Sequence, residues 1–405
     1  MAYCCHPEEV RVITDRRKDP VAVAVIVVAI NMVSGQPRDP SSPDEYVGGL
    51  RMTASNMKKN LFILLILILP LLLTGCVDVR IAGKDGGVFR SPDKGEIWQQ
   101  KVFVERIKKK QIKTIANANI SQMIFHPIDS KTIYLTTRED GAWLTEDGGE
   151  KWSPLFTTNG RIDGFVPHPK SKNIIYLSQG QRIFKTTDGG KEWAPIYLET
   201  KLEQFITFLA IDFYDPKKIY AGISDGRLIR SLDEGESWKI VKDFEGYIKQ
   251  ILINPKDTRI IYVVVSGKGI FRSADTGKTW QEINAGLNNY SGAKQIQIAI
   301  FDQTQSDALM IASLYGLLKT NDGGKTWQPL KLLTQPGTIF IYSLALNPKN
   351  SREIYYGTGR ALYKSDDGGS TWITKSLPTG RAASYLLVDP DDPDMIYLGA
   401  GKVKK

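Results

Sequence analysis

One short pattern occurs seven times along this chain of 405 residues and constrains its fold more than any other feature. The pattern is Ser or Thr, any residue, Asp, any residue, Gly, two further residues and Trp, and we call each copy a box. The boxes are Ser91–Trp98, Thr145–Trp152, Thr186–Trp193, Ser231–Trp238, Ser273–Trp280, Thr320–Trp327 and Ser365–Trp372. They hold seven of the eight tryptophans, and successive box Asp residues are 54, 41, 45, 42, 47 and 45 residues apart. A repeat of roughly 45 residues is typical of a radial array of small sheets.

Each repeat contains four short segments with the alternation expected of β-strands. Strand a is apolar and runs toward Pro, strand b begins with Ile-Tyr, strand c leads into the box, and strand d begins at the box Trp. The fifth copy, Ile298–Asp302 to Leu309–Ala312, lacks the Pro and the Tyr. In six of the seven repeats, Lys or Arg stands immediately before the box Ser or Thr. Four antiparallel strands per repeat form one blade of a propeller. We therefore predict an all-β, seven-bladed β-propeller of four-stranded antiparallel blades, with six or eight blades as the alternatives.

The two ends of the repeat region are incomplete in complementary ways. The first box is preceded by strands near Val79–Ile81 and Val88–Ser91, and the chain ends with strands at Tyr385–Val388 and Met395–Leu398. Joined, the two pieces make the seventh blade, and this closure leaves no sheet edge free. Strand b occurs at both ends, so the sequence leaves open which copy is used.

The segment before the repeats has the three parts of a secretory signal. It is basic at Met57-Lys58-Lys59, apolar over Leu61–Leu73, and ends in Leu73-Thr74-Gly75-Cys76. The apolar run is shorter than the roughly 20 residues that a membrane-spanning helix needs. The ending resembles the lipobox of bacterial lipoproteins, which implies that residues 57–75 are a signal peptide and that Cys76 is the lipidated first residue of the mature protein. We expect residues 1–56 to be a disordered upstream extension.

Composition says little about partners. The net charge is +9, and the longest basic run is Lys108-Lys109-Lys110, so no nucleic-acid partner is indicated. The three cysteines, Cys4, Cys5 and Cys76, lie outside the repeats, and packing rather than disulfides must hold the fold together. We therefore predict one propeller domain over residues 76–405.

The box itself indicates a structural turn. Its Asp accepts N–H bonds across a hairpin loop, its Gly supplies a positive φ, and its Trp brings a large apolar ring. We assign this role to Asp93, Asp147, Asp188, Asp233, Asp275, Asp322 and Asp367, and to Trp98, Trp152, Trp193, Trp238, Trp280, Trp327 and Trp372. A calcium loop needs several oxygen ligands, whereas each box has one regular carboxylate, so we expect no metal. His126 and His168 lack a third ligand and are expected to be structural.

The boxes resemble the BNR or Asp-box repeats of sialidases, sortilin-type receptors, some xyloglucanases and the photosystem II assembly/stability factor family. The segment from Ile354-Tyr355-Tyr356-Gly357-Thr358-Gly359 through Lys364–Trp372 is most similar to the last family and to its sortilin-like bacterial relatives. The resemblance covers about residues 79–400 and implies a propeller fold. It implies no single activity, because this fold carries unrelated functions.

Blade connectivity predicts which loops share a face. The a–b and c–d loops lie on the face with the boxes, the box face, and the b–c loops and blade-to-blade connections lie on the opposite face. Six arginines are predicted on the opposite face: Arg138, Arg161, Arg182, Arg227, Arg360 and Arg381. Guanidinium groups bind carboxylates in bidentate fashion, so these residues form a candidate binding face. The alternative is that they are solubilising charges, several of them paired with neighbouring Asp or Glu.

A glycoside hydrolase of sialidase or xyloglucanase type is the alternative function. The Arg-Ile-Pro motif of the sialidases is missing, and Val88-Phe89-Arg90-Ser91-Pro92 stands in its place. Asp140, Asp163 and Asp225 could supply a pair of carboxylates, but their spacing singles out none of them. We therefore assign no catalytic residue.

These observations favour a lipid-anchored propeller in the cell envelope, on the outer side of the cytoplasmic membrane or in the outer membrane. It would act as a scaffold that binds or assembles proteins, as its resemblance to the sortilin-like and photosystem assembly factor-like families implies. The expected partner is a protein or peptide, anionic if the arginines bind it. We expect no cofactor, no metal, no nucleic acid, and a monomer.

Overall fold

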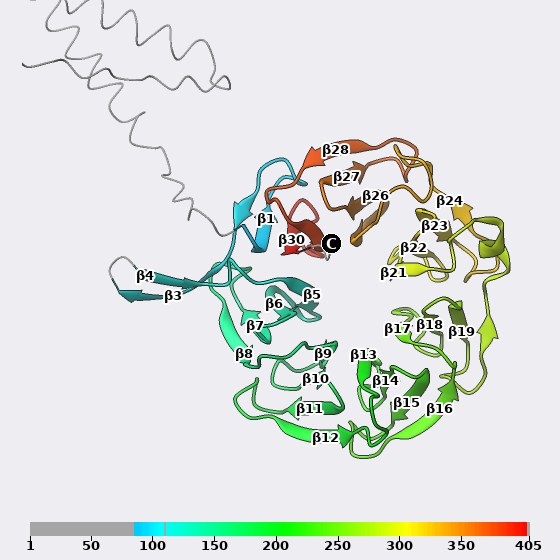
Figure 1. Cartoon of the computed structure of the whole chain (residues 1–405), viewed down its shortest axis with the longest axis horizontal. Coiled ribbons are helices and arrows are strands. Elements are labelled where there is room, and N and C mark those ends of the chain that lie inside the picture. Colours follow the sequence, from blue (N-terminus) through cyan, green and yellow to red (C-terminus); the bar gives the residue numbers. More distant parts are fainter. Residues whose placement is uncertain (1–84, 109–110, 403–405) are drawn as a thin grey trace, which may run out of the picture. The chain divides into compact units, whose positions relative to one another are not determined.

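In the computed structural model, residues 85–108 and 111–402 are described, and they form a ring of seven four-stranded antiparallel sheets (Figure 1). This confirms the predicted seven-bladed, all-β propeller and excludes six or eight blades. One short 3-10 helix, η1 (Ala285–Asn289), occurs among these residues. The expectations for residues 1–56, the signal peptide 57–75, Cys76 and the strand near Val79–Ile81 fall outside the described residues.

Six blades are continuous in sequence, and their strands run outward from the axis in chain order. Blade 1 is β5 (Ile120–His126), β6 (Asp129–Thr137), β7 (Ala142–Thr145) and β8 (Ser153–Phe156); blade 2 is β9 (Gly164–Pro167), β10 (Ile175–Gln179), β11 (Arg182–Thr186) and β12 (Ala194–Leu198). Blade 3 is β13 (Ile206–Ile211), β14 (Ile219–Ile223), β15 (Arg227–Ser231) and β16 (Lys239–Asp243); blade 4 is β17 (Ile248–Ile253), β18 (Ile261–Val265), β19 (Gly269–Ser273) and β20 (Gln281–Glu282). Blade 5 is β21 (Ile296–Phe301), β22 (Leu309–Ser313), β23 (Leu317–Thr320) and β24 (Gln328–Pro329); blade 6 is β25 (Ser343–Asn347), β26 (Asn350–Gly357), β27 (Ala361–Ser365) and β28 (Ile373–Ser376).

The seventh blade joins the two ends of the described chain. Its sheet order is β2-β1-β30-β29, made from β29 (Ala382–Val388), β30 (Ile396–Gly401), β1 (Gly87–Ser91) and β2 (Gln99–Gln100). β1 pairs with β30 over its whole length, with Phe89 opposite Leu398. The strand b used for closure is therefore the C-terminal copy, which settles the choice that the sequence left open.

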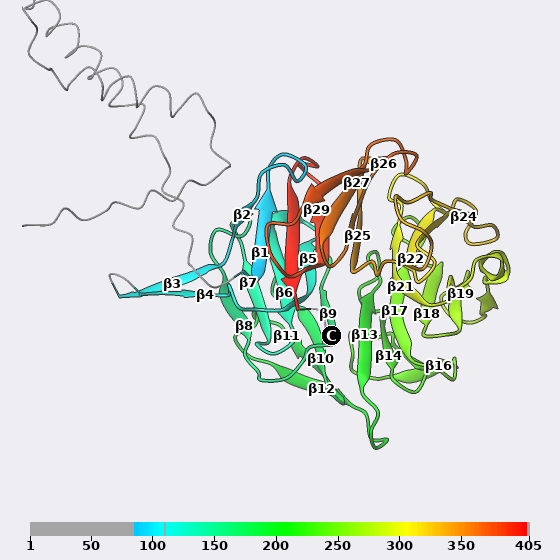
Figure 2. The ribbon, with the colours of Figure 1, turned by 45° about the horizontal axis from the view of Figure 1, so that its top comes forward.

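One element was not predicted from the sequence. A hairpin of β3 (Phe103–Lys108) and β4 (Gln111–Thr114) lies between β2 of blade 7 and β5 of blade 1. It projects outward from the ring in both ribbon views (Figures 1 and 2). This insertion explains why the first step between boxes, 54 residues, is the longest.

The hydrophobic core is divided into seven clusters, and each cluster is shared by two neighbouring blades. Some box tryptophans pack against the preceding blade, next to the end of its strand d. Three indole N–H groups donate to backbone carbonyls of the preceding blade: Trp152 to Lys101 O (2.9 Å), Trp327 to Ile283 O (3.3 Å) and Trp372 to Lys331 O (3.0 Å). These three rings are nearly inaccessible, at 0%, 5% and 8% exposure. Burial thus differs between boxes, and Trp238 is only half-buried.

Two recurrent sequence signals form contacts between blades. In blades 7, 2 and 3, the strand b tyrosine donates its hydroxyl to the carbonyl of the fourth box residue in the next blade. In blades 7 and 3, the arginine before the box Ser donates to the same carbonyl. The bonds are Tyr397 to Gly148 O (3.2 Å), Tyr176 to Glu234 O (3.3 Å), Tyr220 to Thr276 O (3.3 Å), Arg90 to Gly148 O (2.9 Å) and Arg230 to Thr276 O (2.7 Å). The Ile-Tyr and Lys/Arg signals therefore connect blade 7 to blade 1, blade 2 to blade 3, and blade 3 to blade 4.

Candidate functional site

Each box closes the turn between strands c and d of a blade. In the blade 4 box, Ser273 Oγ donates to Asp275 Oδ1 (2.8 Å) and accepts from the N–H of Gly277 (2.8 Å). Thr279 donates its N–H (2.9 Å) and its hydroxyl (2.6 Å) to the two oxygens of the same carboxylate. The box Gly has a φ between 84° and 96° in all seven copies. The residue before it also has a positive φ, even where it is not glycine, as at Lys94 (59°). The carboxylate oxygens are therefore engaged within the turn.

The box carboxylates predict a loss of stability in acid. Hydrogen bonds from Thr279 lower the pKa of Asp275 to about 2, from an ordinary value of 3.8. Because the folded pKa is depressed, the contribution to stability is full above about pH 4 and is lost as the pH falls toward 2. We expect the thermal unfolding midpoint to decrease as the pH is lowered from 4 to 2. In the Asp275→Asn variant, this decrease should be smaller. An identical pH profile for Asp275→Asn would contradict this role of the carboxylate.

The two histidines also accept hydrogen bonds within turns. The Nδ1 atoms of His126 and His168 accept from the N–H groups of Ile128 (3.3 Å) and Lys170 (3.2 Å). Burial lowers the pKa of both rings. No group of three or more His, Cys, Asp or Glu side chains that could hold a metal ion occurs in residues 85–108 and 111–402. In this same part of the chain, no helix has the length and apolar character to cross a membrane.

The structure places the six arginines on consecutive blades of the face opposite the boxes. Arg360 lies after β26 in blade 6, Arg381 leads into β29 of blade 7, and Arg138 follows β6 in blade 1. Arg161 leads into β9 and Arg182 begins β11, both in blade 2, and Arg227 begins β15 in blade 3. In ring order these are blades 6, 7, 1, 2 and 3, so the arginines cover one unbroken arc. We call these six residues the arginine arc.

Three members of the arginine arc are bound within the propeller. Arg227 forms ion pairs with Glu199 (3.1 Å) and Asp225 (2.9 Å), and its side chain is 18% exposed. Arg161 pairs with Asp163 at 2.7 Å. Burial opposes the charge of Arg227, but the hydrogen bonds that its guanidinium donates to the carboxylates of Glu199 and Asp225 raise its pKa overall. These arginines match the paired-charge alternative.

The third of these, Arg381, connects the last blade to the first residues of the described chain. Its side chain is 12% exposed and pairs with Asp85 at 3.2 Å. It also donates to the carbonyl oxygens of Asn117 (3.0 Å) and Ala118 (3.2 Å), which precede β5. Arg381 thus holds blades 7 and 1 together at the seam.

The other three, Arg138, Arg182 and Arg360, present free guanidinium groups. None of them forms a side-chain hydrogen bond or ion pair with any described residue. Arg182 and Arg360 are exposed, and Arg138 is partly so. They remain available to an external carboxylate, which a guanidinium binds with two parallel hydrogen bonds. They are the candidate binding residues that the structure leaves unengaged.

Aromatic side chains lie on the same face as the arginine arc, on the connections into blades 3, 4 and 6. Phe205 and Tyr247 lie with ring centroids 6.2 Å apart on the connections into blades 3 and 4. Phe340 and Tyr342 lie 4.6 Å apart on the connection into blade 6, where Phe340 is 41% exposed. Burial raises the pKa of Tyr247, and the charges of Arg161 and Asp163 also act on it. None of these four aromatics was predicted from the sequence, although each lies within three residues of an inner strand.

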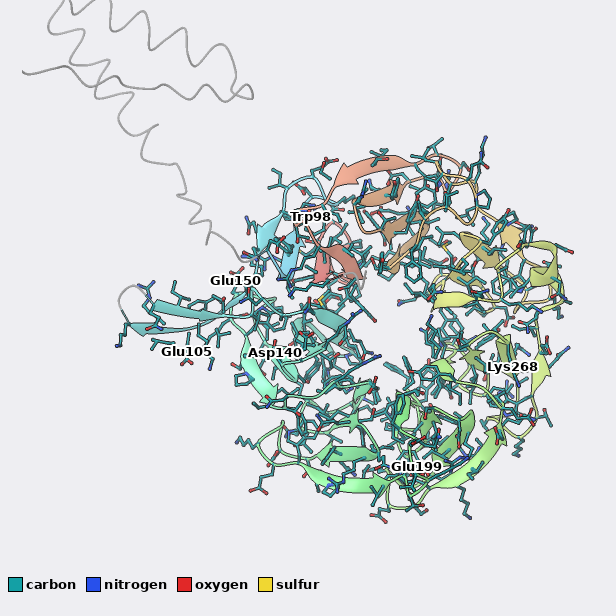
Figure 3. All side chains as sticks on the ribbon, in the orientation of Figure 1. Trp98, Glu105, Asp140, Glu150, Glu199 and Lys268 are labelled. Atoms are coloured by element: carbon teal, nitrogen blue, oxygen red, sulfur yellow. The ribbon has the colours of Figure 1, made fainter. Side chains whose placement is uncertain are left out.

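The three carboxylates considered for hydrolysis have separate environments. Asp225 is held by Arg227 and Lys201, and these hydrogen bonds lower its pKa although burial opposes them. Asp140 is exposed on blade 1, well away from Glu199 and Lys268 in the side-chain view (Figure 3). Burial raises the pKa of Asp163, against the nearby charge of Arg161. Asp163 thus has the raised pKa expected of a general acid.

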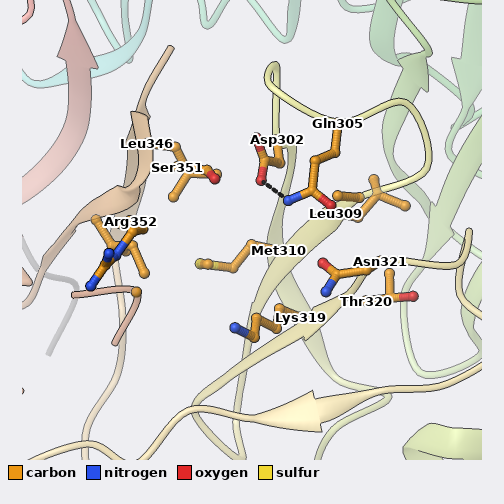
Figure 4. A pocket seen from close by; sticks show the side chains of 13 residues that line it. Asp302, Gln305, Leu309, Met310, Lys319, Thr320, Asn321, Leu346, Ser351 and Arg352 are labelled. Carbon is orange, nitrogen blue, oxygen red and sulfur yellow. Dashed lines mark hydrogen bonds between the residues drawn. The ribbon is translucent and has the colours of Figure 1, made fainter. Parts of the chain in front are cut away.

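Two pockets differ in their relation to the arginine arc: the first lies on the box side, and the second is lined by Asp243, the strand partner of Arg227. One, of about 160 Å³, opens between blades 5 and 6 on the box side and is lined by residues such as Asp302, Lys319 and Arg352 (Figure 4). The second, of about 470 Å³, lies at the edge of blade 4, where Lys242, Asp243, Glu245 and Lys268 mix both charges. Neither pocket contains two carboxylates together with a free arginine.

Comparison with known proteins agrees with this architecture. The family model described as sortilin, neurotensin receptor 3, matches residues 226–314. No curated protein matches the sequence. Together with the boxes and the sheet order, the family match defines the class: the chain is a BNR-type β-propeller.

Solved structures show the same fold at low sequence identity. The GH74 enzyme of Niastella koreensis has a TM-score of 0.58 and 19% identity, over 70% of this chain and 51% of that one. YCF48 bound to a D1 peptide has a TM-score of 0.53 and 20% identity, over 71% of this chain and 94% of that one. YCF48 from Cyanidioschyzon merolae has a TM-score of 0.54 and 18% identity, over 70% and 95%. The chain thus spans about half the length of the GH74 enzyme, and these likenesses show the fold.

Proposed function

We propose that this propeller is a lipid-anchored scaffold of the cell envelope that binds a protein or peptide segment on the face opposite the boxes. The recognised segment carries carboxylates for the free arginines and apolar or aromatic side chains for the neighbouring rings. Cys76 provides the anchor after removal of residues 57–75. The role is that of a binding or assembly factor.

The observation that carries this proposal is the set of unengaged guanidinium groups at Arg138, Arg182 and Arg360. Three cations without partners on one arc favour an anionic ligand. Each exposed guanidinium can exchange bound water for a ligand carboxylate, and its desolvation costs little free energy. The aromatic pairs Phe205–Tyr247 and Phe340–Tyr342 stand at the two ends of this arc, on blades 3, 4 and 6. YCF48, which has the same fold, is described with a bound peptide, and this similarity supports a peptide ligand here.

The test compares two triple variants as bait for partners from detergent-solubilised native envelopes. Arg138→Gln, Arg182→Gln and Arg360→Gln together remove the free arginines, and we expect retention of the specific partner to fall roughly 10- to 100-fold. Lys151→Gln, Lys191→Gln and Lys278→Gln remove the same charge from exposed lysines on the box face and should retain it. Equal retention by both variants would overturn the face assignment. Arg227 is excluded from the test because its loss would leave Glu199 unpaired.

The anchor has its own test. Mass spectrometry of the mature protein from membranes should find an N-terminal Cys76 that carries acyl chains. A peptide from residues 1–56 in the membrane fraction, or an unmodified Cys76, would overturn that part of the proposal.

Glycoside hydrolysis remains the second candidate, and the observation in its favour is the raised pKa of Asp163. A GH74 xyloglucanase from Xanthomonas campestris has the same fold, which makes xyloglucan the substrate to try. We expect no release of reducing ends from xyloglucan. Release that is abolished by Asp163→Asn would establish the hydrolase instead.

A further inference from the structure

The β3–β4 hairpin is an addition to the propeller whose base and outer part differ in character. At the base, Val102, Val104 and Ile115 are buried in the cluster between blades 7 and 1. The N–H of Trp152 donates to Phe103 O (2.8 Å), and the N–H of Ile115 donates to Val102 O (2.9 Å). The hairpin is therefore fixed to the ring at this end.

Beyond its base, the described part of the hairpin is exposed to solvent. Every described residue from Glu105 to Lys108 and from Gln111 to Lys113 is exposed. Ile107 and Ile112 are 53% and 40% exposed, although isoleucine favours the interior of proteins. A two-stranded hairpin is only marginally stable in water without a surface to pack against. The exposed isoleucines thus indicate a surface that the hairpin contacts.

The charge on the hairpin specifies the kind of surface. Arg106, Lys108 and Lys113 flank the two isoleucines, and Arg106 lies directly opposite Ile112 across the strand pair. One carboxylate, Glu105, is present in these strands, and it pairs weakly with Lys113 at 3.3 Å, with both side chains about half exposed. Arg106 and Lys108 have no side-chain partner among the described residues. Cations beside isolated apolar side chains are the combination that adsorbs to anionic bilayers.

The start of the described chain lies at the same place. The N–H groups of Gly86 and Gly87 donate to Ala116 O (2.8 Å) and Ala118 O (3.1 Å), just after the hairpin. Asp85 lies nine positions after Cys76, and even a fully extended chain of that length spans only about 30 Å. An anchor at Cys76 would therefore keep this seam, and the hairpin with it, near the membrane.

We propose that the β3–β4 hairpin is a docking surface for anionic phospholipid headgroups. Arg106, Lys108 and Lys113 bind the phosphates, and Ile107 and Ile112 insert at the headgroup boundary. The inference rests on the proposed membrane location for its relevance in the cell, but not for the binding itself. Together, the anchor and the hairpin hold the propeller by two attachments at one seam and so restrict its rotation on the membrane.

The test uses the full chain with Cys76→Ser, so that no lipid is attached, in sedimentation with vesicles. Phosphatidylcholine vesicles are compared with vesicles in which about a third of the lipid is anionic phosphatidylglycerol. The readout is the ratio of the two partition coefficients, because the apolar run Leu61–Leu73 sets the same baseline in every variant. We expect the ratio to exceed ten and to fall with added salt.

The decisive comparison is between two variants of equal charge. Arg106→Gln, Lys108→Gln and Lys113→Gln should lower the ratio at least tenfold, since each cation near an anionic surface contributes roughly fivefold. The box-face variant Lys151→Gln, Lys191→Gln, Lys278→Gln should keep it, and Ile107→Ser with Ile112→Ser should weaken binding without changing the charge. Equal ratios for the two charge variants, or no preference for anionic vesicles, would overturn the proposal. An unmodified Cys76 would overturn the anchor but leave this vesicle result standing.

Discussion

Trp152→Ala is expected to lower the free energy of unfolding by about 3–5 kcal/mol. The side chain is fully buried between blades 7 and 1, in a cluster with Val88, Val102 and Met123. Its indole N–H also donates to Lys101 O at 2.9 Å, so the truncation leaves both a cavity and an unsatisfied carbonyl. The cavity would open at the seam where the two ends of the chain meet. Chemical denaturation followed by circular dichroism measures the change.

Trp238→Ala is the matched control, because Trp238 occupies the same box position in blade 3. Its ring is half-buried and contacts Tyr197 with centroids 5.7 Å apart. We expect a smaller loss of about 1–2 kcal/mol, since less surface leaves contact with the protein. Equal losses for the two variants would show that the box position, rather than burial, sets the contribution of the tryptophan.

Lys94→Met is expected to lower the free energy of unfolding by about 2–3 kcal/mol. Lys94 Nζ lies 2.9 Å from Glu353 Oε2, and the Glu353 side chain is only 4% exposed. Removing one partner of a buried pair typically costs about 3–5 kcal/mol, and the 33% exposure of Lys94 allows water to reduce that cost. The hydrogen bond to Glu353 raises the pKa of Lys94, as expected for a cation stabilised by this contact. The pair connects blade 6 to the box of blade 7.

A double-mutant cycle separates the pair from its surroundings. Glu353 also accepts from Asn347 Nδ2 (3.2 Å) and from the Tyr355 hydroxyl, so Glu353→Gln keeps neighbours for its side-chain oxygen. We expect Glu353→Gln to cost less than Lys94→Met, and the double variant to be no less stable than Lys94→Met alone. Additive losses would mean that the two side chains act independently.

The repeated parts of the fold were predictable because each one is encoded locally. A box specifies its own turn through Ser273, Asp275 and Gly277, and the same pattern recurs at a period that indicates blades. The β3–β4 hairpin was not predicted, since it occurs once and has no repeated counterpart for comparison. The unequal burial of Trp152 and Trp238 was also not predicted, because it depends on side chains that come from the preceding blade.

The candidate site was predictable only in part. Connectivity alone placed the arginines on the face opposite the boxes. Which of them are free depends on distant partners: Arg381 is paired with Asp85, 296 residues earlier in the chain. The residues next to Arg381 in the sequence do not indicate such a pairing. The aromatic residues Phe205 and Phe340 were missed for a related reason, because their connections differ in length and composition from blade to blade.

The shared seventh blade sets the order of events in folding. β1 finds its partner, β30, only after the chain between Ser91 and Ile396 has been made. The six sequence-continuous blades can form from local contacts, but closure of the ring depends on a pairing of very high contact order. During synthesis, one edge of β1 therefore stays unpaired until the last residues emerge, a period when it is exposed to association with other chains. We expect ring closure to be the slow step of folding, and the seam to be the first place where the native ring opens.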